Sequence, residues 1–363
     1  MKAVRMLPVT AAVPAPPSLL RIAEGVDDRI RSLLKDELAR WSEVDPGLVD
    51  PLEALGRLVL SGGKRLRPAF CHWAFVGAGG DGDDPAVVDA GAALELLHTF
   101  ALIHDDVMDG SPTRRAMGTI HTQFEERHGL ESWRGEGRRF GEGVAVLVGD
   151  LAFVYADQLL AAAPADAVAV FTELRIEVNI GQYLDLVGTA RGQVTESAAR
   201  SISRFKSGKY TVERPLHMGA ALAGRLDDLA GPLSAYGLPL GDAFQMRDDL
   251  LGAFGDEAAT GKPVGEDLRE GKPTVLYAIA RQRAGRRSAA AATLRRYGAP
   301  DLSDDEIADM QDVMVEVGAV AQVEATIDGL VGEALGALAG AHLAPHARRA
   351  LSELAAYVAG RDR

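Results

Sequence analysis

The residues best suited to chemistry close one apolar run, the stretch Glu95–Asp109, which ends in Asp105, Asp106 and Asp109. On a helix, Asp105 and Asp109 are four residues apart and share one face. A plain core helix would not hold three carboxylates, and solvated aspartates would not need an apolar stripe behind them. Mg²⁺ fits both facts, because it binds one or two carboxylates and leaves coordination positions for phosphate oxygens. The stretch therefore predicts a magnesium site at the end of a buried helix.

A second acidic pair, Asp248 and Asp249, ends another apolar run in the other half of the chain. If the two helices that carry these runs face each other, both acidic clusters converge on one cavity. Facing carboxylates of this kind can hold several divalent ions. The sequence therefore predicts one site that is assembled from both halves.

Clusters of positive residues are informative here because the chain as a whole is acidic, with a net charge of −13. Three cations follow two glycines in the turn Gly62–Pro68, which suggests an anion site, although a solvated turn with ordinary surface basics is the simpler interpretation. Arg114 and Arg115 lie just past the first acidic run. They can hold a diphosphate from its other side, or they can merely neutralise the aspartates.

Three lysines complete the candidate site, and a polar pair nearby in the sequence is assigned to helix packing. Lys206 lies in a buried-looking helix and needs an anionic partner there, unless it is an exposed lysine. Lys262 and Lys272 lie in a long glycine-rich loop after the second acidic run, and such loops often carry function or act as lids. Gln182 and Asp185 share one helix face, where we expect them to form a hydrogen bond between packed helices.

The elements that must position these residues are predicted to be helices. Apolar residues recur near a 3.6-residue period through most of the chain. Helices are predicted over about 19–45, 51–60, 70–76, 85–108, 144–160, 165–187, 197–222 and 233–251, followed by structural helices in the last ninety residues. Residues 129–143, rich in glycine and arginine, are predicted to form an extended loop.

Composition supports this helical interpretation. The chain has 363 residues, of which 47% are apolar and only 6% aromatic, a balance that favours closely packed helices over an all-β core. The length suffices for one large domain or two ordinary ones. The negative net charge argues against bulk attraction to nucleic acid or an anionic membrane.

The N-terminus and the cysteine content bear on location. Residues 1–18 are rich in alanine and proline and are predicted to form a disordered tail, so that 19–363 form one domain. We expect no transmembrane segment, because no run reaches about eighteen apolar residues. Cys71 is the single cysteine, which excludes an intrachain disulfide and a Cys-based zinc site and suits the cytoplasm.

In their order and spacing, these motifs resemble those of the trans-isoprenyl diphosphate synthases, the polyprenyl synthetase family, from about residue 20 to the C-terminus. The motifs are Gly-Gly-Lys-Arg-x-Arg-Pro at 62–68, Asp-Asp-x-x-Asp at 105–109, Arg114-Arg115, Lys206-Ser207, Phe244-Gln245 before Asp248-Asp249, and the Gly-Lys loop. The resemblance implies an all-α fold, a single large helical bundle around a deep central cavity, usually present as a homodimer.

The resemblance also implies a role for each matching residue. Several Mg²⁺ ions per site would be bound by Asp105, Asp106, Asp109, Asp248 and Asp249. The allylic diphosphate and its metals would contact Arg114, Lys206, Gln245, Lys262 and Lys272, and isopentenyl diphosphate would contact Lys64, Arg67, His98 and Arg115. Two positions depart from the family pattern. Gly252 replaces the usual third aspartate of the second motif, so water or Asp256 would have to compensate, and Ser207 replaces threonine but keeps the hydroxyl.

The implied reaction is the condensation of isopentenyl diphosphate with dimethylallyl, geranyl or farnesyl diphosphate. Phe100 lies five residues before Asp105, about 7.5 Å down a helix, where it would form the floor that limits the growing chain, and Ala101 beside it is small and leaves room. Within the family, an aromatic at this position with a small neighbour resembles C20 synthases. We therefore expect geranylgeranyl diphosphate, with the C15 farnesyl and the C25 products as alternatives.

Two other functions would leave different signatures. A terpene cyclase would carry Asn-x-x-x-Ser-x-x-x-Glu where this chain has Asp248-Asp249, and it would have no use for a basic turn that binds a second diphosphate. A non-catalytic regulatory subunit of a heteromeric synthase should show eroded aspartates or lysines. Here the first motif is whole and the second lacks one aspartate, so an active prenyltransferase is favoured.

Overall fold

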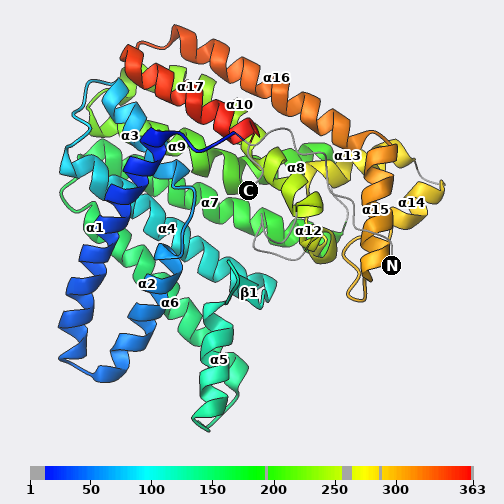
Figure 1. Ribbon diagram of the computed structural model, residues 1–363, viewed down its shortest axis with the longest axis horizontal. Coiled ribbons are helices and arrows are strands. Elements are labelled where there is room, and N and C mark those ends of the chain that lie inside the picture. Colours follow the sequence, from blue (N-terminus) through cyan, green and yellow to red (C-terminus); the bar gives the residue numbers. More distant parts are fainter. Residues whose placement is uncertain (1–12, 193–194, 256–263, 286–287, 361–363) are drawn as a thin grey trace.

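The chain folds as an assembly of helices in the computed structural model, which describes residues 13–192, 195–255, 264–285 and 288–360 (Figure 1). The described strands are β1 (Thr113–Arg114) and β2 (Met117–Gly118), which pair antiparallel just after the first acidic motif. The predicted all-α fold is confirmed.

The segments predicted to be helical are helical, but the helices that begin at Gly137 and Leu226 start seven residues before their predicted starts, and the helix that begins at Ile120 was not predicted. The first half contains α1 (Pro17–Ser42), η1 (Pro46–Leu48), α2 (Val49–Leu60), α3 (Leu66–Gly77), α4 (Pro85–Asp109), α5 (Ile120–Leu130), α6 (Gly137–Leu159) and α7 (Ala165–Arg191). The second half contains α8 (Glu196–Ser203), η2 (Arg204–Glu213), α9 (Arg214–Leu222), α10 (Leu226–Phe254), α12 (Glu266–Glu270), α13 (Val275–Ala284), α14 (Ala289–Leu294), α15 (Asp304–Glu316), α16 (Ala319–Gly340) and α17 (Pro345–Gly360).

Helix α4 lies in the core and ends at the first acidic motif. Asp84 caps its start by accepting from the Ala86 N–H, and Gly110 ends it in a left-handed conformation that suits glycine. The helix packs against α1, α2, α3 and α6. Of the helices described, α4 alone has the length and composition of a membrane span, and 61% of the window concerned is buried inside the fold. A core helix has this composition as well.

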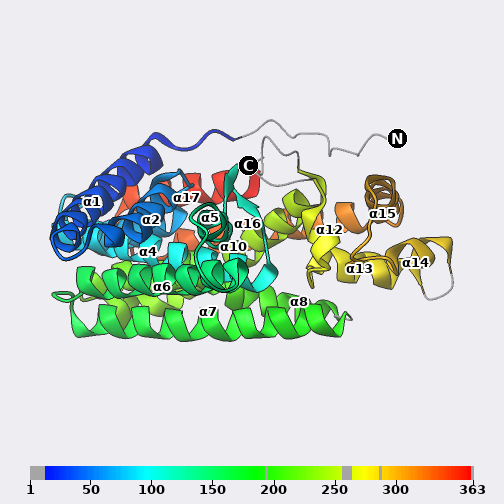
Figure 2. The same ribbon diagram turned by 90° about the horizontal axis from the view of Figure 1, so that it is seen from below.

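The second acidic helix, α10, is enclosed by elements from the second half. It packs along α16 and η2 and contacts α9, α13 and α17. Helices α16 and α17 run beside it in Figure 1. Helices α6 and α7 lie side by side along another face of the molecule (Figure 2). The two acidic helices are therefore both held inside the bundle.

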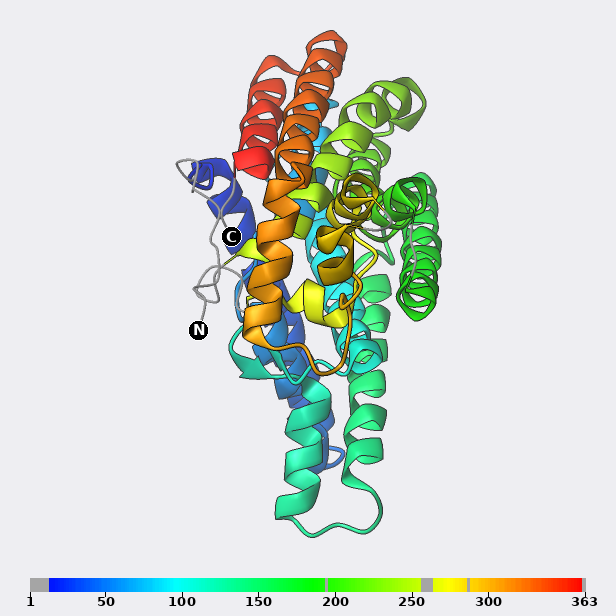
Figure 3. The same ribbon diagram turned by 90° about the vertical axis from the view of Figure 1, so that its right-hand side faces the viewer.

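The loop predicted over 129–143 is too long, since only residues 131–136 connect two helices. Helix α5 continues to Leu130 and α6 begins at Gly137, and the pair projects beyond the body of the molecule (Figure 3). Gly135 lies in the short connection with a positive φ, whereas Gly141 serves helix packing. A Cβ at Gly141 would lie 2.1 Å from the carbonyl oxygen of His121, so only glycine allows α6 to approach α5 this closely.

The predicted N-terminal tail is only partly described. Residues 1–12 lie outside the described part of the chain. Helix α1 begins at Pro17, two residues before the predicted boundary, because proline suits the first position of a helix. The backbone N–H of Val13 also donates to the Gly360 carbonyl at 3.3 Å.

Candidate active site

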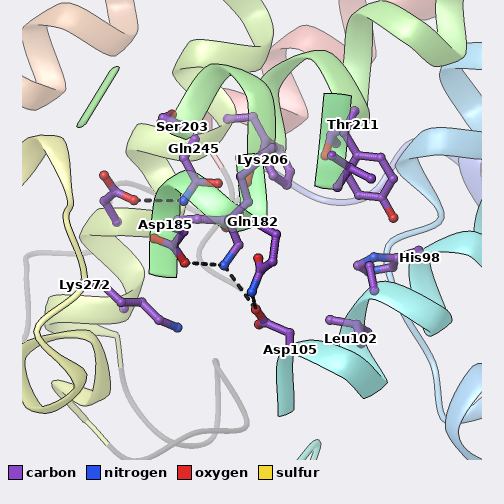
Figure 4. A pocket seen from close by; sticks show the side chains of 18 of the residues that line it. His98, Leu102, Asp105, Gln182, Asp185, Ser203, Lys206, Thr211, Gln245 and Lys272 are labelled. Atoms are coloured by element: carbon purple, nitrogen blue, oxygen red, sulfur yellow. Dashed lines mark hydrogen bonds and ion pairs between the residues drawn. The ribbon is translucent and has the colours of Figure 1, made fainter. Parts of the chain in front are cut away.

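One cavity of about 550 Å³ contains most of the residues singled out in the sequence. Its walls come from both halves of the chain, including α4, α7, η2, α10 and α12 (Figure 4). The predicted residues that line it are Lys64, Arg67, His98, Ala101, Asp105, Arg114, Arg115, Lys206, Ser207, Gln245, Asp248, Asp249 and Lys272. Asp106, Asp109 and Phe100 are described but do not line it, and Lys262 and Asp256 lie outside the described residues. The prediction of one site built from two acidic motifs agrees with this placement.

Asp105 is the centre of a polar network at the first motif. The Lys206 ammonium lies 3.1 Å from its Oδ1 and 2.6 Å from Asp185 Oδ2, and Gln182 Nε2 donates to Asp105 at 2.7 Å (Figure 4). Burial raises the pKa of Asp105, but Lys206, Lys272 and Arg114 outweigh it and lower that pKa to about 2. Asp105 is therefore ionised and available to a cation.

Gln182 and Asp185 were predicted to form a hydrogen bond between packed helices, and Gln182 of α7 does donate to Asp105 of α4. Both line the cavity and contact the Asp105–Lys206 pair. The Lys206 pKa is raised, because Asp105 and Asp185 outweigh the effect of burial. The spacing of three residues was visible in the sequence, but their partners come from α4 and η2, which no local pattern reveals.

Asp106 takes a different role from its two neighbours. It is buried away from the cavity lining, and the Arg114 Nε donates to its two carboxylate oxygens at 2.7 and 2.9 Å. This follows from helix geometry, since adjacent residues differ by about 100° around the axis. The placement does not fit the metal-ligand role predicted for Asp106. It matches the alternative in which Arg114 neutralises an aspartate.

Lys272 connects the first motif to the segment that carries α12. Its Nζ lies 3.7 Å from Asp109, 3.7 Å from Asp267 and 2.6 Å from Glu270. Burial lowers its pKa, but these carboxylates raise it well above the usual value. The Asp109 pKa is raised to about 6 by burial and by the Asp105 charge. Lys272 is thus a buried cation at the edge of both motifs.

Asp249 in the second motif is fully enclosed. It accepts from Gln245 Nε2 at 2.9 Å and from the Val275 N–H at 3.2 Å. Burial raises its pKa to about 7, and the Asp267 and Asp248 charges add to the shift although the two hydrogen bonds oppose it. A buried carboxylate that is unfavourable in this way is stabilised by any cation that joins it.

The donor set suits Mg²⁺. The acidic side chains of the cavity present carboxylate oxygens, the hard ligands that this ion prefers. In the part of the chain that is described, no three His, Cys, Asp or Glu side chains already converge on one point. Few protein ligands per ion are what Mg²⁺ needs when phosphate oxygens and waters complete its shell.

The opposite wall is basic and contains polar atoms without partners. The Arg67 guanidinium lies 4.1 Å from the centre of the Tyr210 ring and donates to Thr211 Oγ1 at 3.0 Å. Arg67 Nε, His98 Nδ1 and the Tyr210 hydroxyl are buried and lack a hydrogen-bond partner among the described residues. Burial and the nearby arginines lower the His98 pKa well below its usual value, so the ring is neutral. Buried polar atoms of this kind suit a polar ligand.

One cation of the basic turn, Arg65, lines the cavity but is already paired with carboxylates of the protein. Arg65 adopts a left-handed conformation and is buried, where it pairs with Glu95 at 2.7 Å and Asp27 at 2.8 Å. Gly62 and Gly63 also have positive φ, which glycine adopts without strain. Arg65 therefore fixes the turn. The interpretation of 62–68 as an ordinary solvated turn is wrong.

The segment that carries Lys206 is a π-helix, η2, instead of the regular helix predicted over 197–222. Two glycines on neighbouring helices allow it to lie against them. A Cβ at Gly181 of α7 would lie 2.3 Å from the Lys206 backbone nitrogen, and a Cβ at Gly241 of α10 would lie 2.5 Å from the Gly208 carbonyl oxygen. π-Helical turns occur often at functional sites. Here the wider turn places Lys206, Ser207 and Tyr210 on the cavity wall.

Phe100 is not among the described residues that line the cavity. Its ring packs 4.9 Å from Phe153 of α6 and 4.5 Å from His104, measured between ring centres. Ala101 and Leu102 line the cavity instead. A direct role for Phe100 as the floor of the cavity does not fit this placement.

Comparison with known proteins identifies the family. The polyprenyl synthetase family model matches residues 50–314. The chain belongs to the polyprenyl synthetase family. The synthase is 34% identical over 264 residues to a geranylgeranyl diphosphate synthase of Sulfolobus acidocaldarius. The aligned region covers 70% of this chain and 71% of the relative. It is 31% identical over 276 residues to a geranylfarnesyl diphosphate synthase of Aeropyrum pernix, and this aligned region covers 74% of this chain and 80% of the relative.

A solved structure extends the similarity to nearly the whole chain. The geranylgeranyl pyrophosphate synthase from Corynebacterium glutamicum, complexed with isoprenyl diphosphate and magnesium, superposes on the synthase with a TM-score of 0.89 at 37% identity. The match covers 95% of this chain and 99% of that one. The synthase is a prenyltransferase of isoprenoid biosynthesis that makes short-chain trans-prenyl diphosphates.

Proposed function

We propose that the synthase joins isopentenyl diphosphate head-to-tail to dimethylallyl, geranyl or farnesyl diphosphate and releases geranylgeranyl diphosphate, the C20 product. The observation that carries the proposal is the shared cavity. Two acidic motifs and a basic wall with unpartnered polar atoms line the same space. That arrangement suits two diphosphates, of which one is held through metal ions and the other by arginine and histidine.

The residues divide the work between the two diphosphates. Asp105, Asp109, Asp248 and Asp249 would hold several Mg²⁺ ions, which supply Lewis-acid stabilisation of a leaving diphosphate. Lys206 adds positive charge beside Asp105, where negative charge develops on that leaving group. On the basic wall, Lys64, Arg67, His98 and Arg115 bind and orient isopentenyl diphosphate in this proposal.

The bond changes then need no protein nucleophile. The allylic C–O bond breaks with its electron pair on diphosphate, and the alkene pair of isopentenyl diphosphate forms the new C–C bond. The carbocation that results then loses a proton, which restores an alkene, and we assign the departing diphosphate as the acceptor of that proton. Leu102, Val178 and Phe244 line the cavity and exclude water from the cation.

The C20 length rests on similarity and on the small residue at the wall. Relatives named geranylgeranyl diphosphate synthase support it. Ala101 lies four residues before Asp105 on the cavity side of α4, and it leaves room for a growing chain. The test is to incubate the purified chain with Mg²⁺, isopentenyl diphosphate and each primer and to identify the products by mass. A main product of C15 or C25 would contradict the proposal.

We also propose that the synthase is a homodimer through α6 and α7. These two helices lie side by side (Figure 2), and both expose apolar side chains. They are Val146, Leu147 and Val154 of α6 and Val168, Ile176, Ile180, Tyr183 and Leu186 of α7. A second copy would cover this face, because a two-fold axis pairs identical patches. Light scattering should give twice the monomer mass for the wild type. The double variant Leu147→Glu with Ile180→Glu should give the mass of a single monomer.

The cytoplasm is the proposed location. Cys71, the single cysteine of the sequence, is buried as a free thiol, which suits a reducing compartment. Fractionation of cells that express the tagged chain tests this directly. The alternative of a regulatory subunit predicts no product from the isolated chain, so the same product assay separates the two.

A further inference from the structure

Position 252 in the second motif lies directly against a carboxylate from another segment. A Cβ built on Gly252 would lie 1.9 Å from Asp267 Oδ2 and 2.4 Å from its Cγ. Real Cβ atoms essentially never come within 3.0 Å of another heavy atom. The Asp267 carboxylate therefore occupies the space in which a side chain at 252 would begin.

Asp267 also belongs to the same cavity wall as the motif. Gly252 is four residues after Asp248 on α10, so both share one helix face. Asp248, Asp249, Gly252 and Asp267 all line the cavity. A carboxylate from α12 thus stands where the motif would otherwise present its third carboxylate.

Several contacts hold Asp267 in this place. It is the second residue of α12, which starts after Gly265 in a left-handed conformation, and the next residue, Leu268, is buried. The Lys272 N–H donates to the Asp267 carbonyl at 3.2 Å, and Lys272 Nζ lies 3.7 Å from the carboxylate. The Gly298 N–H donates to the Leu268 carbonyl at 3.0 Å. The carboxylate is therefore positioned by the fold of the segment.

We propose that Asp267 supplies the carboxylate that the second motif lacks, and that position 252 is glycine because Asp267 fills its place. The proposal rests on the metal-dependent function proposed above. It makes two statements about this chain. Glycine at position 252 does not mean that the site has lost a metal ligand. The segment that carries α12 forms part of the metal site together with α10.

The consequence is that restoring the missing aspartate should damage the site. Gly252→Asp would force two carboxylates into one space, so Mg²⁺ binding should weaken. Asp267→Gly removes the carboxylate and should raise the Mg²⁺ concentration for half-saturation by about 10- to 100-fold. The double variant Gly252→Asp with Asp267→Gly moves the carboxylate back to α10. It should recover most of the loss.

The experiment measures metal binding without turnover. The rise in Tm of the purified chain with Mg²⁺ and inorganic pyrophosphate is followed as Mg²⁺ is titrated, for the wild type, both single variants and the double variant. Each Tm in chelator shows whether the variant folds. Asp256→Ala tests the competing carboxylate that the sequence suggested.

The outcomes separate this inference from the proposed function. A wild type with no response to Mg²⁺ and pyrophosphate would contradict the metal-dependent site itself. If the wild type responds and Asp267→Gly responds equally, or if Asp256→Ala alone reproduces the loss, the assignment of Asp267 is overturned. Improved binding in Gly252→Asp alone would overturn it as well. Recovery in the double variant but in neither single variant supports it.

Discussion

Removing the charge of Asp249 should stabilise the metal-free protein. This carboxyl is buried and its pKa is raised to about 7 by burial and by the Asp267 and Asp248 charges. An asparagine side chain at this position would keep the shape and an oxygen that can accept a hydrogen bond, but it cannot ionise. The substitution Asp249→Asn therefore tests whether the second motif stores unfavourable electrostatic energy when no cation is present.

The pKa shift sets the size and the sign of the effect. A rise from 3.8 to about 7 corresponds to about 4 kcal/mol at ~1.4 kcal/mol per unit. The folded state holds this proton more tightly than the unfolded state. Stability from this group is therefore present below about pH 4, falls as the pH rises to 7, and is constant above that. Asp249→Asn should be more stable than wild type by roughly 2–4 kcal/mol at pH 8, and this advantage should shrink by roughly 2–3 kcal/mol at pH 5.

Urea unfolding in chelator at pH 5 and pH 8 measures both numbers. The matched control adds Mg²⁺ and pyrophosphate, which should stabilise the wild type more than Asp249→Asn. If the variant is less stable than wild type at pH 8, or if the difference does not depend on pH, the electrostatic reasoning about the second motif is refuted.

Three further predictions concern the cavity wall and its support. Ala101→Phe should shorten the main product on chromatography, whereas Phe100→Ala should change it less, since only Ala101 lines the cavity; the reverse ranking would contradict this geometry. Gly181→Ala should lower kcat at least tenfold and also lower the Tm, because the added Cβ would lie within 3 Å of backbone atoms of η2, with the Lys206 backbone nitrogen at 2.3 Å; unchanged kcat would show that the π-helix tolerates displacement. Glu177→Gln should destabilise the fold by about 2 kcal/mol at pH 7 in urea unfolding, because it removes the carboxylate that pairs with the partly buried Lys209 and Arg214. Burial raises the Glu177 pKa, but its cationic partners Arg214 and Lys209 outweigh burial, so that the pKa is lowered overall. The loss in Glu177→Gln should therefore shrink as the pH falls below about 4.5 and through the lowered pKa, and a loss that persists there would point to packing.

The helical periodicity of the sequence was sufficient to predict most of the helices and the position of the two acidic motifs at helix ends. The predicted ranges for α4 and α10 agree with the structure because long apolar runs at a 3.6-residue period specify buried helices. The same geometry could have corrected two assignments. Asp106 lies about 100° from Asp105, and Phe100 lies about 140° from it, whereas Ala101 lies only about 40° away.

Other features depend on contacts between distant segments. The π-helical form of η2 is accommodated by Gly181 and Gly241 on two other helices, so no local pattern predicts it. Arg65 and Arg67 are two residues apart in one motif, yet a left-handed backbone sends Arg65 to buried carboxylates. The role of Asp267 follows from its contact with position 252, which only the fold reveals.

The central claim is that this single chain carries out metal-dependent prenyl transfer in the cavity shared by its two acidic motifs. The most direct measurement is diphosphate release by the isolated protein from isopentenyl and farnesyl diphosphates, with Mg²⁺ and with chelator. We predict steady release with Mg²⁺, none with chelator, and a C20 product in amounts that match the diphosphate released. Absence of release from the isolated protein with Mg²⁺, or equal release in chelator, would contradict the claim.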